Sequence, residues 1–259
     1  RSDNERRTSD AVDLAVKGRV RLAGATHRFN AGVLFTRYVA RFERQAFNYV
    51  GSGTIDGRAS VPADPALTDE NTNRNERSTE LHLQDMLPLG QAWSLWAGLR
   101  HTRLGRESVR TDGSRATNYT QSFTTPWLAL SHAFSAQTQA YASLGESLES
   151  DVVPNRARYA NAGQALPALK SRQVELGLKH TSEAFDARIA AFDIRRPATG
   201  DFHTDDDAPA LDDCSDADPC VRRSDGIARH RGIEAEAEWH SGDLSLRGSA
   251  MLLRARRSG

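Results

Sequence analysis

The 259-residue sequence contains only two cysteines and two methionines, has few apolar residues at 38%, and carries no excess of either charge. Its 34 basic and 34 acidic residues give a formal net charge of zero, which provides no electrostatic attraction to nucleic acid. No stretch approaches the roughly 18 consecutive apolar residues that a membrane-spanning helix needs. The nearest is the interrupted run at 87–99. We therefore expect no nucleic-acid partner and no spanning helix.

Signatures of enzymes and resident metal ions are also lacking. The eight histidines form no HExxH pattern, and no GxSxG, P-loop or dinucleotide-binding glycine signature occurs. His82, His101 and His132 fall in alternating segments, where wall residues are the simpler interpretation. The opening residues RSDNERRTSD have no apolar segment behind them, so no signal peptide is expected in this chain. The sequence predicts no catalytic residue, no metal site and no cofactor.

Alternation of apolar and polar residues with a period of two recurs about ten times, which predicts long β-strands. Residues 168–180, ALKSRQVELGLKH, are an example. The apolar set there is Val174, Leu176 and Leu178, and the polar set is Gln173, Glu175 and Lys179. In a soluble sheet the apolar set faces a dry core. In an outer-membrane barrel it faces lipid, and the charged set lines a wet lumen.

The connections between the alternating segments favour the barrel. They alternate between short ones of about two to five residues and long ones of about 11 to 30, as periplasmic turns and extracellular loops do. The segments also run for roughly 12 to 16 residues, against about five or six for strands of soluble proteins. The predicted fold class is all-β, an antiparallel transmembrane β-barrel segment of about ten long meandering strands with short periplasmic turns and long extracellular loops.

This prediction orients the side chains. Aromatic residues close to the short turns are expected at the membrane interface, where amphipathic rings are favoured; the alternative is that they are core residues near hairpin ends. They are Trp93, Phe134, Phe185 and Trp239. The charged residues expected to face the lumen are Glu175, Lys179, Glu234, Glu236 and Glu238. Val174, Leu176 and Leu178 are expected to touch lipid.

A set of short motifs then follows in order between about residues 80 and 254. The motifs are WAGLRHTRL, TPWLALSHAF, the YAS strand at 141–143, LKS at 169–171, ExGxK at 175–179, FDI at 192–194 and RGIE at 231–234. Each is degenerate alone, but their order and spacing resemble the barrel region of TonB-dependent outer-membrane receptors, particularly the ferric-siderophore group. The resemblance implies a 22-stranded barrel around a plug domain of roughly 150 residues. We therefore expect 1–259 to be a partial barrel domain, with the plug and the C-terminal strands absent.

The resemblance also implies a function, which is uptake of a ferric siderophore or a similar scarce ligand across the outer membrane of a Gram-negative bacterium. Its implied partners are the TonB complex, reached through the plug, and outer-membrane lipid with lipopolysaccharide. One alternative is a diffusion porin, distinguished by whether a plug is encoded upstream. Another is a soluble or surface β-rich binding or adhesion protein, which would be recovered without detergent.

Two segments carry candidate sites. Cys214 and Cys220 lie six apart in a predicted extracellular loop, which in an exported protein suggests a local disulfide. The eight aspartates between 201 and 218 are interpreted as a solvated acidic loop rather than a cation site, since they match no EF-hand spacing. In the loop at 151–167, Arg156, Arg158 and Tyr159 are candidate ligand-binding residues, because Arg and Tyr suit anionic or catecholate chelates. Contact with lipopolysaccharide phosphates or with water is the alternative for these basic residues.

Overall fold

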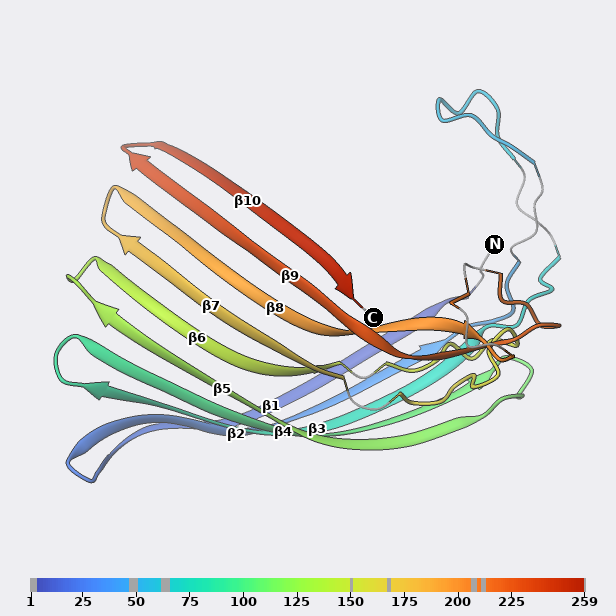
Figure 1. The fold of residues 1–259 in the computed structure, drawn as a ribbon, viewed down its shortest axis with the longest axis horizontal. Helices are drawn as coiled ribbons and strands as arrows, with labels where there is room; N and C mark the ends of the chain where they lie inside the picture. Colours follow the sequence, from blue (N-terminus) through green and yellow to red (C-terminus); the bar gives the residue numbers. More distant parts are fainter. Residues whose placement is uncertain are drawn as a thin grey trace.

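The computed structural model describes residues 4–46, 51–61, 66–149, 151–166, 169–205, 209–210 and 213–258. They form one ten-stranded sheet in which every strand pairs with its neighbours in the sequence, in the order β1 to β10 (Figure 1). The strands are β1 (Arg6–Leu22), β2 (Ala25–Arg41), β3 (Thr72–Leu89), β4 (Trp93–Arg110), β5 (Thr117–Ala133), β6 (Thr138–Glu149), β7 (Leu169–Thr181), β8 (Phe185–His203), β9 (Cys220–Ser241) and β10 (Leu244–Ser258). All nine pairings are antiparallel. The predicted all-β antiparallel meander is confirmed.

The sheet is an open, curved wall. Among the described residues β1 and β10 do not pair with each other, so the wall does not close. The short turns gather at one end of the wall, on the left of Figure 1, and the long connections gather at the other. These ends are called the turn end and the loop end below. The described residues contain no helix long and apolar enough to span a membrane.

The strands extend further than the alternation suggested. β9 has 22 residues, and Cys220 is its first residue rather than part of a loop. β4 reaches Arg110 and β5 begins at Thr117, which leaves 111–116 between them. The prediction that all four long connections exceed about 11 residues is therefore wrong for this one. The polar segment at 107–118 continues the ladder because its Ser and Thr side chains pair across it, as in the 2.6 Å contact between the Ser108 and Thr117 hydroxyls.

The two-residue turn between β1 and β2 shows how the short connections reverse the chain. Ala23 and Gly24 both have positive φ, at 49° and 80°, the backbone combination of a type I′ turn. Such a turn matches the right-handed twist of the flanking strands, whereas its mirror image would splay them. The turn therefore fixes the register from Leu22 opposite Ala25 up to Arg6 opposite Arg41.

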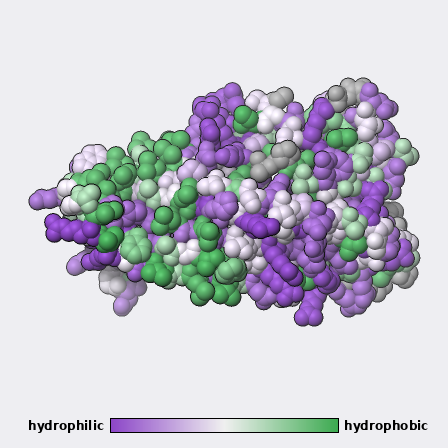
Figure 2. Space-filling view, turned by 90° about the horizontal axis from the view of Figure 1, so that it is seen from below, coloured by the Kyte–Doolittle hydropathy of each residue, from purple (hydrophilic) through white to green (hydrophobic). Residues whose placement is uncertain are grey.

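The two faces of the wall differ in chemistry. Cross-strand partners share a face, and Val174, Leu176 and Leu178 are 58%, 62% and 41% exposed. The connection at 151–166 instead packs against side chains of the opposite face, such as Gln121. We call the face it covers the inner face and the other the outer face. Figure 2 shows hydrophobic side chains gathered toward the turn end and hydrophilic ones over the loop end.

Aromatic rings fill the space above strand glycines on the inner face. Gly98 of β4 lies directly opposite Trp127 of β5, and a Cβ at Gly98 would lie 2.1 Å from the indole Nε1. Tyr141 covers Gly177 in the same manner, with a ring carbon 2.4 Å from the added Cβ. The lack of a side chain at Gly98 and Gly177 thus leaves the space that the Trp127 and Tyr141 rings occupy.

Replacement of Gly98 by valine in the full receptor is expected to displace Trp127 and to destabilise the barrel by about 1–3 kcal/mol, the usual cost of overpacking. The apparent unfolding temperature and the tryptophan fluorescence in detergent measure the effect. Gly105→Ala is the matched control on the same strand, since its added Cβ meets only the Thr120 hydroxyl at 3.8 Å. Equal effects of the two substitutions would contradict the packing explanation.

Candidate ligand-binding site

The connection at 151–166 folds onto the inner face at the loop end. The Gln121 amide of β5 donates to the Leu166 carbonyl at 3.1 Å, and the Asn155 amide donates to the Arg115 carbonyl at 2.6 Å. Val153, Tyr159 and Leu166 form a small buried cluster, each at most 4% exposed. The connection therefore has a packed centre of its own and occupies a defined position against the wall.

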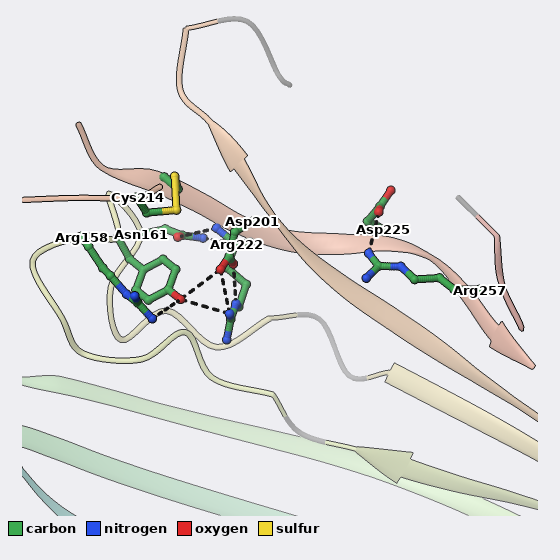
Figure 3. Close-up of polar contacts among 9 residues, drawn as sticks. Arg158, Asn161, Asp201, Cys214, Arg222, Asp225 and Arg257 are labelled. Carbon is green, nitrogen blue, oxygen red and sulfur yellow. Dashed lines mark hydrogen bonds and ion pairs between the residues drawn. A yellow bond between two sulfur atoms is a disulfide. The ribbon is translucent and has the colours of Figure 1, made fainter. Parts of the chain in front are cut away.

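A group of polar side chains, which we call the loop anchor, fixes this connection to β8 and β9 (Figure 3). It consists of Tyr159, Asn161, Asp201 and Arg222. The Arg222 guanidinium donates to both oxygens of Asp201, at 2.6 and 2.9 Å. The Tyr159 hydroxyl donates to Asp201 at 3.1 Å and accepts from Arg222 at 3.1 Å. Every polar atom of the tyrosine is thus committed within the protein.

Main-chain contacts extend the loop anchor. Asn161 donates to the Arg222 carbonyl at 2.8 Å and accepts from the Arg222 amide at 3.1 Å. The backbone of Cys220 exchanges hydrogen bonds with Ala160 and Arg158, at 2.9 and 3.0 Å. A disulfide joins Cys220 to Cys214, and Cys220 is fully buried. The disulfide-closed segment 214–220 therefore ends where the 151–166 connection is bonded to β9.

The charges of the loop anchor stabilise each other. Hydrogen bonding to Arg222 lowers the pKa of Asp201 below its ordinary value of 3.8, although burial opposes the shift. The same contact raises the pKa of Arg222. Asp201 lies near the loop end of β8, beyond the apolar part of the strand. The pair is fully ionised at neutral pH.

Between the 151–166 connection and the first four strands lies a cavity of about 410 Å³, which we call the basic pocket. Its lining includes Arg7, Tyr38, Arg74, Arg106 and Arg156, one or more from each of β1 to β4 and one from the connection. The Arg74 guanidinium stacks 5.0 Å above the Tyr38 ring, and that of Arg106 lies 5.7 Å from the Tyr119 ring. The pocket thus presents several cations and aromatic faces to one volume.

One carboxylate sits between two of these cations. Glu76 lies 3.0 Å from Arg74 and 2.6 Å from Arg106, and all three are on the inner face because they alternate with outward residues. Both contacts are ion pairs between an arginine Nε and the same Glu76 oxygen, so the carboxylate occupies one edge of each guanidinium group. Glu76 adjoins the pocket through these two arginines, and Glu70 is the carboxylate among the described lining residues. The arginines of the lining outnumber Glu70 and the adjacent Glu76, and this net positive charge suits an anionic ligand.

The structure separates the three candidate ligand residues. Arg156 is exposed and lines the basic pocket. Tyr159 is 1% exposed and belongs to the loop anchor. Arg158 stacks on the Tyr159 ring at 5.2 Å and is half-buried. The arrangement gives Tyr159 and Arg158 a part in positioning the connection, whereas ligand binding by Arg156 stays a prediction.

The charged residues expected in the lumen all lie on the inner face, where each takes part in a contact between neighbouring strands. Tyr141 donates to Glu175 at 2.5 Å, and the Lys179 ammonium lies 4.9 Å from the Tyr141 ring centre. Arg188 lies 3.5 Å from Glu234 and 3.7 Å from Glu236. Glu238 accepts from the Ser245 hydroxyl at 3.1 Å. Their facing a water-filled lumen stays a prediction.

The four aromatics proposed for the interface lie beside the short turns. Trp93, Phe134, Phe185 and Trp239 are 45%, 64%, 39% and 42% exposed. Phe185 and Trp239 are direct cross-strand partners, and the His132 ring bridges Trp93 and Phe134 at 4.3 and 4.9 Å. These positions are compatible with contact at headgroup level, which stays a prediction.

The acidic connection after β8 is described only in part, because Asp206, Asp207 and Asp212 lie outside the described residues. In the remainder, His203 contacts Asp213 at 3.3 Å and Asp218 at 3.7 Å. No three His, Cys, Asp or Glu side chains of the described residues are grouped to hold a metal ion.

Sequence reasoning missed the basic pocket. Its cations come from strands that are far apart in the chain, and each alone looks like an ordinary polar residue of an alternating strand. The sequence does not give the register of the strands. The register places Arg74 and Arg106 on the same face, offset by two residues along the paired strands. A weak signal existed in TNRNER at 72–77, where the basic and acidic residues at 74 and 76 share a face.

The fold and the pocket together define a class of protein. A long-stranded meander with short turns at one end, long connections at the other, an apolar outer face and a charged inner face is a section of a large β-barrel wall. The family model described as "TonB dependent receptor-like, beta-barrel" matches residues 1–257, and the chain belongs to that family. Members of this family are outer-membrane transporters of Gram-negative bacteria rather than enzymes.

Solved structures share the fold. BauA, the ferric preacinetobactin receptor from Acinetobacter baumannii, superposes with a TM-score of 0.71 at 22% identity, covering 96% of this chain and 36% of that one. The ferric-catecholate import receptor Fiu from E. coli K12 gives 0.72 at 14% identity, covering 98% and 38%. The FrpB iron transporter from Neisseria meningitidis gives 0.64 at 14%, covering 98% and 36%. No curated protein matches the sequence significantly. The chain spans little more than a third of these solved receptors.

Proposed function

We propose that the chain supplies wall and loop-end surface of a TonB-dependent receptor that takes up a ferric siderophore or a chemically similar anionic iron chelate. The observation that carries the proposal is the basic pocket, where arginines of β1, β3 and β4 and Tyr38 of β2 meet Arg156 of the 151–166 connection. A ferric chelate with catecholate or carboxylate donors carries negative charge and planar groups. Guanidinium groups bind such anions through charge-assisted hydrogen bonds and stack on their rings.

The position of the pocket fits this role. It lies at the loop end of the wall, which in the proposed orientation faces the cell exterior, whereas the inner-face network of Glu175 and Lys179 lies further toward the turn end. A ligand that enters between the long connections would therefore meet Arg156 first. In the whole receptor, energy supplied through TonB and the plug would release the ligand inward. This transport role is favoured over the soluble binding or adhesion alternative by the family to which the chain belongs.

Uptake of radioactive iron tests the proposal in cells that express the full-length gene. Cells would be offered a ferric tricatecholate, ferric citrate and a cationic or neutral hydroxamate complex. We expect uptake of an anionic complex, abolished in a strain without TonB and reduced at least tenfold by Arg156→Ala, since a charge-assisted contact is worth about 1.5–3 kcal/mol. Arg58→Ala is the control, since Arg58 is an exposed arginine of another connection whose ion pair among the described residues is with Asp56, at 3.2 Å.

Three outcomes would count against the proposal. Uptake that persists without TonB would favour the diffusion porin. Transport of the neutral complex in preference to the anionic ones would leave the arginines unexplained. If Arg156→Ala, Arg158→Ala and Tyr159→Ala all left affinity for the transported complex unchanged, the 151–166 connection would have no part in binding.

A further inference from the structure

Four cations gather on the inner face at the turn end, beside the hairpin of β1 and β2 (Figure 1). They are Lys17, Arg19 and Arg21 of β1 and Arg28 of β2, and we call them the turn-end cluster. Arg19 and Arg28 are direct cross-strand partners. Arg28 and Tyr38 are an even number of residues apart on β2, so the cluster shares the inner face with the basic pocket.

The turn-end cluster lacks counter-charges. The described residues supply it no carboxylate within ion-pair distance, in contrast to other inner-face arginines such as Arg100, which lies 3.7 Å from Glu80. Asp85 of the neighbouring strand β3 belongs to the outer face, where its carboxylate lies 2.6 Å from the His27 ring. Like charges directly opposite each other destabilise a sheet. The cluster is therefore more stable when an anion from outside the described chain lies on it.

A depression of about 450 Å³ adjoins the cluster. Its lining includes Lys17, Arg19, Arg28, Met86 and Trp96. The last four form one row across the sheet, since Arg19 is opposite Arg28, Arg28 opposite Met86, and Met86 opposite Trp96. Trp96 is 40% exposed, so part of its ring is open to a ligand. The depression thus combines cations with an aromatic surface.

The adjoining row toward the loop end supplies neutral hydrogen-bonding groups. Lys17 is opposite Asn30, and Asn30 is opposite Gln84. All three residues line the depression. Side-chain amides donate hydrogen bonds without adding charge. A ligand with several anionic oxygens therefore finds charged donors in one row and neutral donors in the next.

The same four strands carry the basic pocket near their other ends. Met86 lies 12 residues after Arg74 on β3, which corresponds to about 40 Å at about 3.3 Å per residue. On β2 the inner-face positions between the two sites are Thr36, Leu34 and Gly32, which carry no charge. Two basic sites with aromatic rings therefore lie on one face, separated by a stretch of β2 without charge.

We propose that the turn-end cluster is a second, inward binding site for the anionic ferric chelate, which occupies it after leaving the basic pocket and before release. This inference rests on the proposed function. Arginine and lysine bind anionic oxygens through charge-assisted hydrogen bonds, and an exposed indole packs against planar ligand rings. A bound anion also relieves the repulsion between Arg19 and Arg28. The second site would retain the chelate when its contacts at the loop end are broken.

The number of chelates bound by the purified full-length receptor in a neutral detergent tests the proposal. Ferric tricatecholate that carries radioactive iron is the probe, and equilibrium dialysis measures the amount bound. We expect two chelates for each natural receptor. Arg19→Gln with Arg28→Gln should weaken one binding step at least tenfold, as expected for the loss of charge-assisted contacts, and leave the other unchanged. Arg106→Gln should weaken the other step instead.

Uptake by cells provides a second readout. Cells with the double variant should bind the chelate at the loop end like cells with the natural receptor, but take it up at a lower maximal rate. Arg37→Gln with Arg77→Gln is the matched control, because these exposed arginines are also direct cross-strand partners but lie on the outer face. Both double variants should unfold at the temperature of the natural receptor or higher, since like charges are removed.

Two results would overturn the proposal. A single bound chelate in both the natural receptor and the double variant would leave the cluster to another anion, such as an acidic segment of the plug. Equal losses in the outer-face control would show a general effect of charge. In either case the proposed function stands if Arg156→Ala still weakens binding, whereas a receptor that binds no anionic chelate would refute the proposed function itself.

Discussion

Replacement of Arg222 by alanine is expected to release the 151–166 connection from the wall. Arg222 provides both hydrogen bonds that neutralise Asp201 and one that fixes the Tyr159 hydroxyl. Breaking a fully buried ion pair costs about 3–5 kcal/mol. Because the side chains of Arg222 and Asp201 keep 26% and 18% exposure, we expect about 2–3 kcal/mol here. The loss should be local, since the contacts join a connection to strand ends.

Hydrogen exchange in the full receptor measures this local opening directly. The amides of residues 153, 160 and 163, which donate to backbone carbonyls, should lose most of their protection. Trypsin should also cleave faster at Arg156 and Arg158. The control is Arg257→Ala, which removes the same charge from the exposed contact with Asp225 at 2.8 Å, where exposures are 52% and 31%. An exposed pair is worth about 0–1 kcal/mol, so protection that falls equally in both variants would contradict this account.

Acid should open the same contact. The pKa of Asp201 is lowered by its hydrogen bond to Arg222, so the contact contributes its full stability above the ordinary value of 3.8. That contribution is lost as the pH falls through the lower pKa of the folded state. Protection of residues 151–166 should therefore be constant between about pH 5 and 8 and decline below about pH 4. Asp201→Asn should lack the acid-dependent decline that belongs to this carboxyl.

Local alternation was enough to predict the strands, because the side-chain period of two appears in the sequence as alternating apolar and polar residues. Val174, Leu176 and Leu178 show it within five residues, and the structure exposes all three on one face. The alternation of short and long connections then predicted a barrel wall whose apolar set of side chains faces lipid. What alternation could not supply was strand length near the loop end. The polar residues of β4 and β5 beyond Thr102 pair through hydroxyl and ionic contacts, which have no hydrophobic signature.

Site residues were harder to predict for a related reason. The sequence of a connection is polar both when its side chains are free to bind a ligand and when they bond the connection to the rest of the protein. Tyr159 resembled a ligand residue in the sequence, yet it is 1% exposed, with Asp201 and Arg222 around its hydroxyl. Those partners lie more than 40 residues away in the chain. Only the register of β8 and β9 and the path of the connection bring them together.

The charge of the basic pocket provides the most direct link between this wall and its ligand. In the full receptor, Arg106→Gln is expected to weaken binding of an anionic ferric chelate about tenfold to a hundredfold, as befits the loss of one charge-assisted contact. Arg106 is suited to this test because its side chain is only 15% exposed. A partly dehydrated cation interacts more strongly with an anion than one in open water does.

Glu76→Gln is expected to act in the opposite direction. It removes the one negative charge between Arg74 and Arg106, so both guanidinium groups become available to the ligand and repulsion of the anion disappears. Arg103→Gln is the matched control, since Arg103 is three residues from Arg106 on the same strand but exposed on the outer face. Fluorescence quenching or calorimetry with the purified receptor measures the three affinities. Weaker binding by Glu76→Gln, or equal losses at Arg103 and Arg106, would show that pocket charge does not determine which chelate the receptor holds.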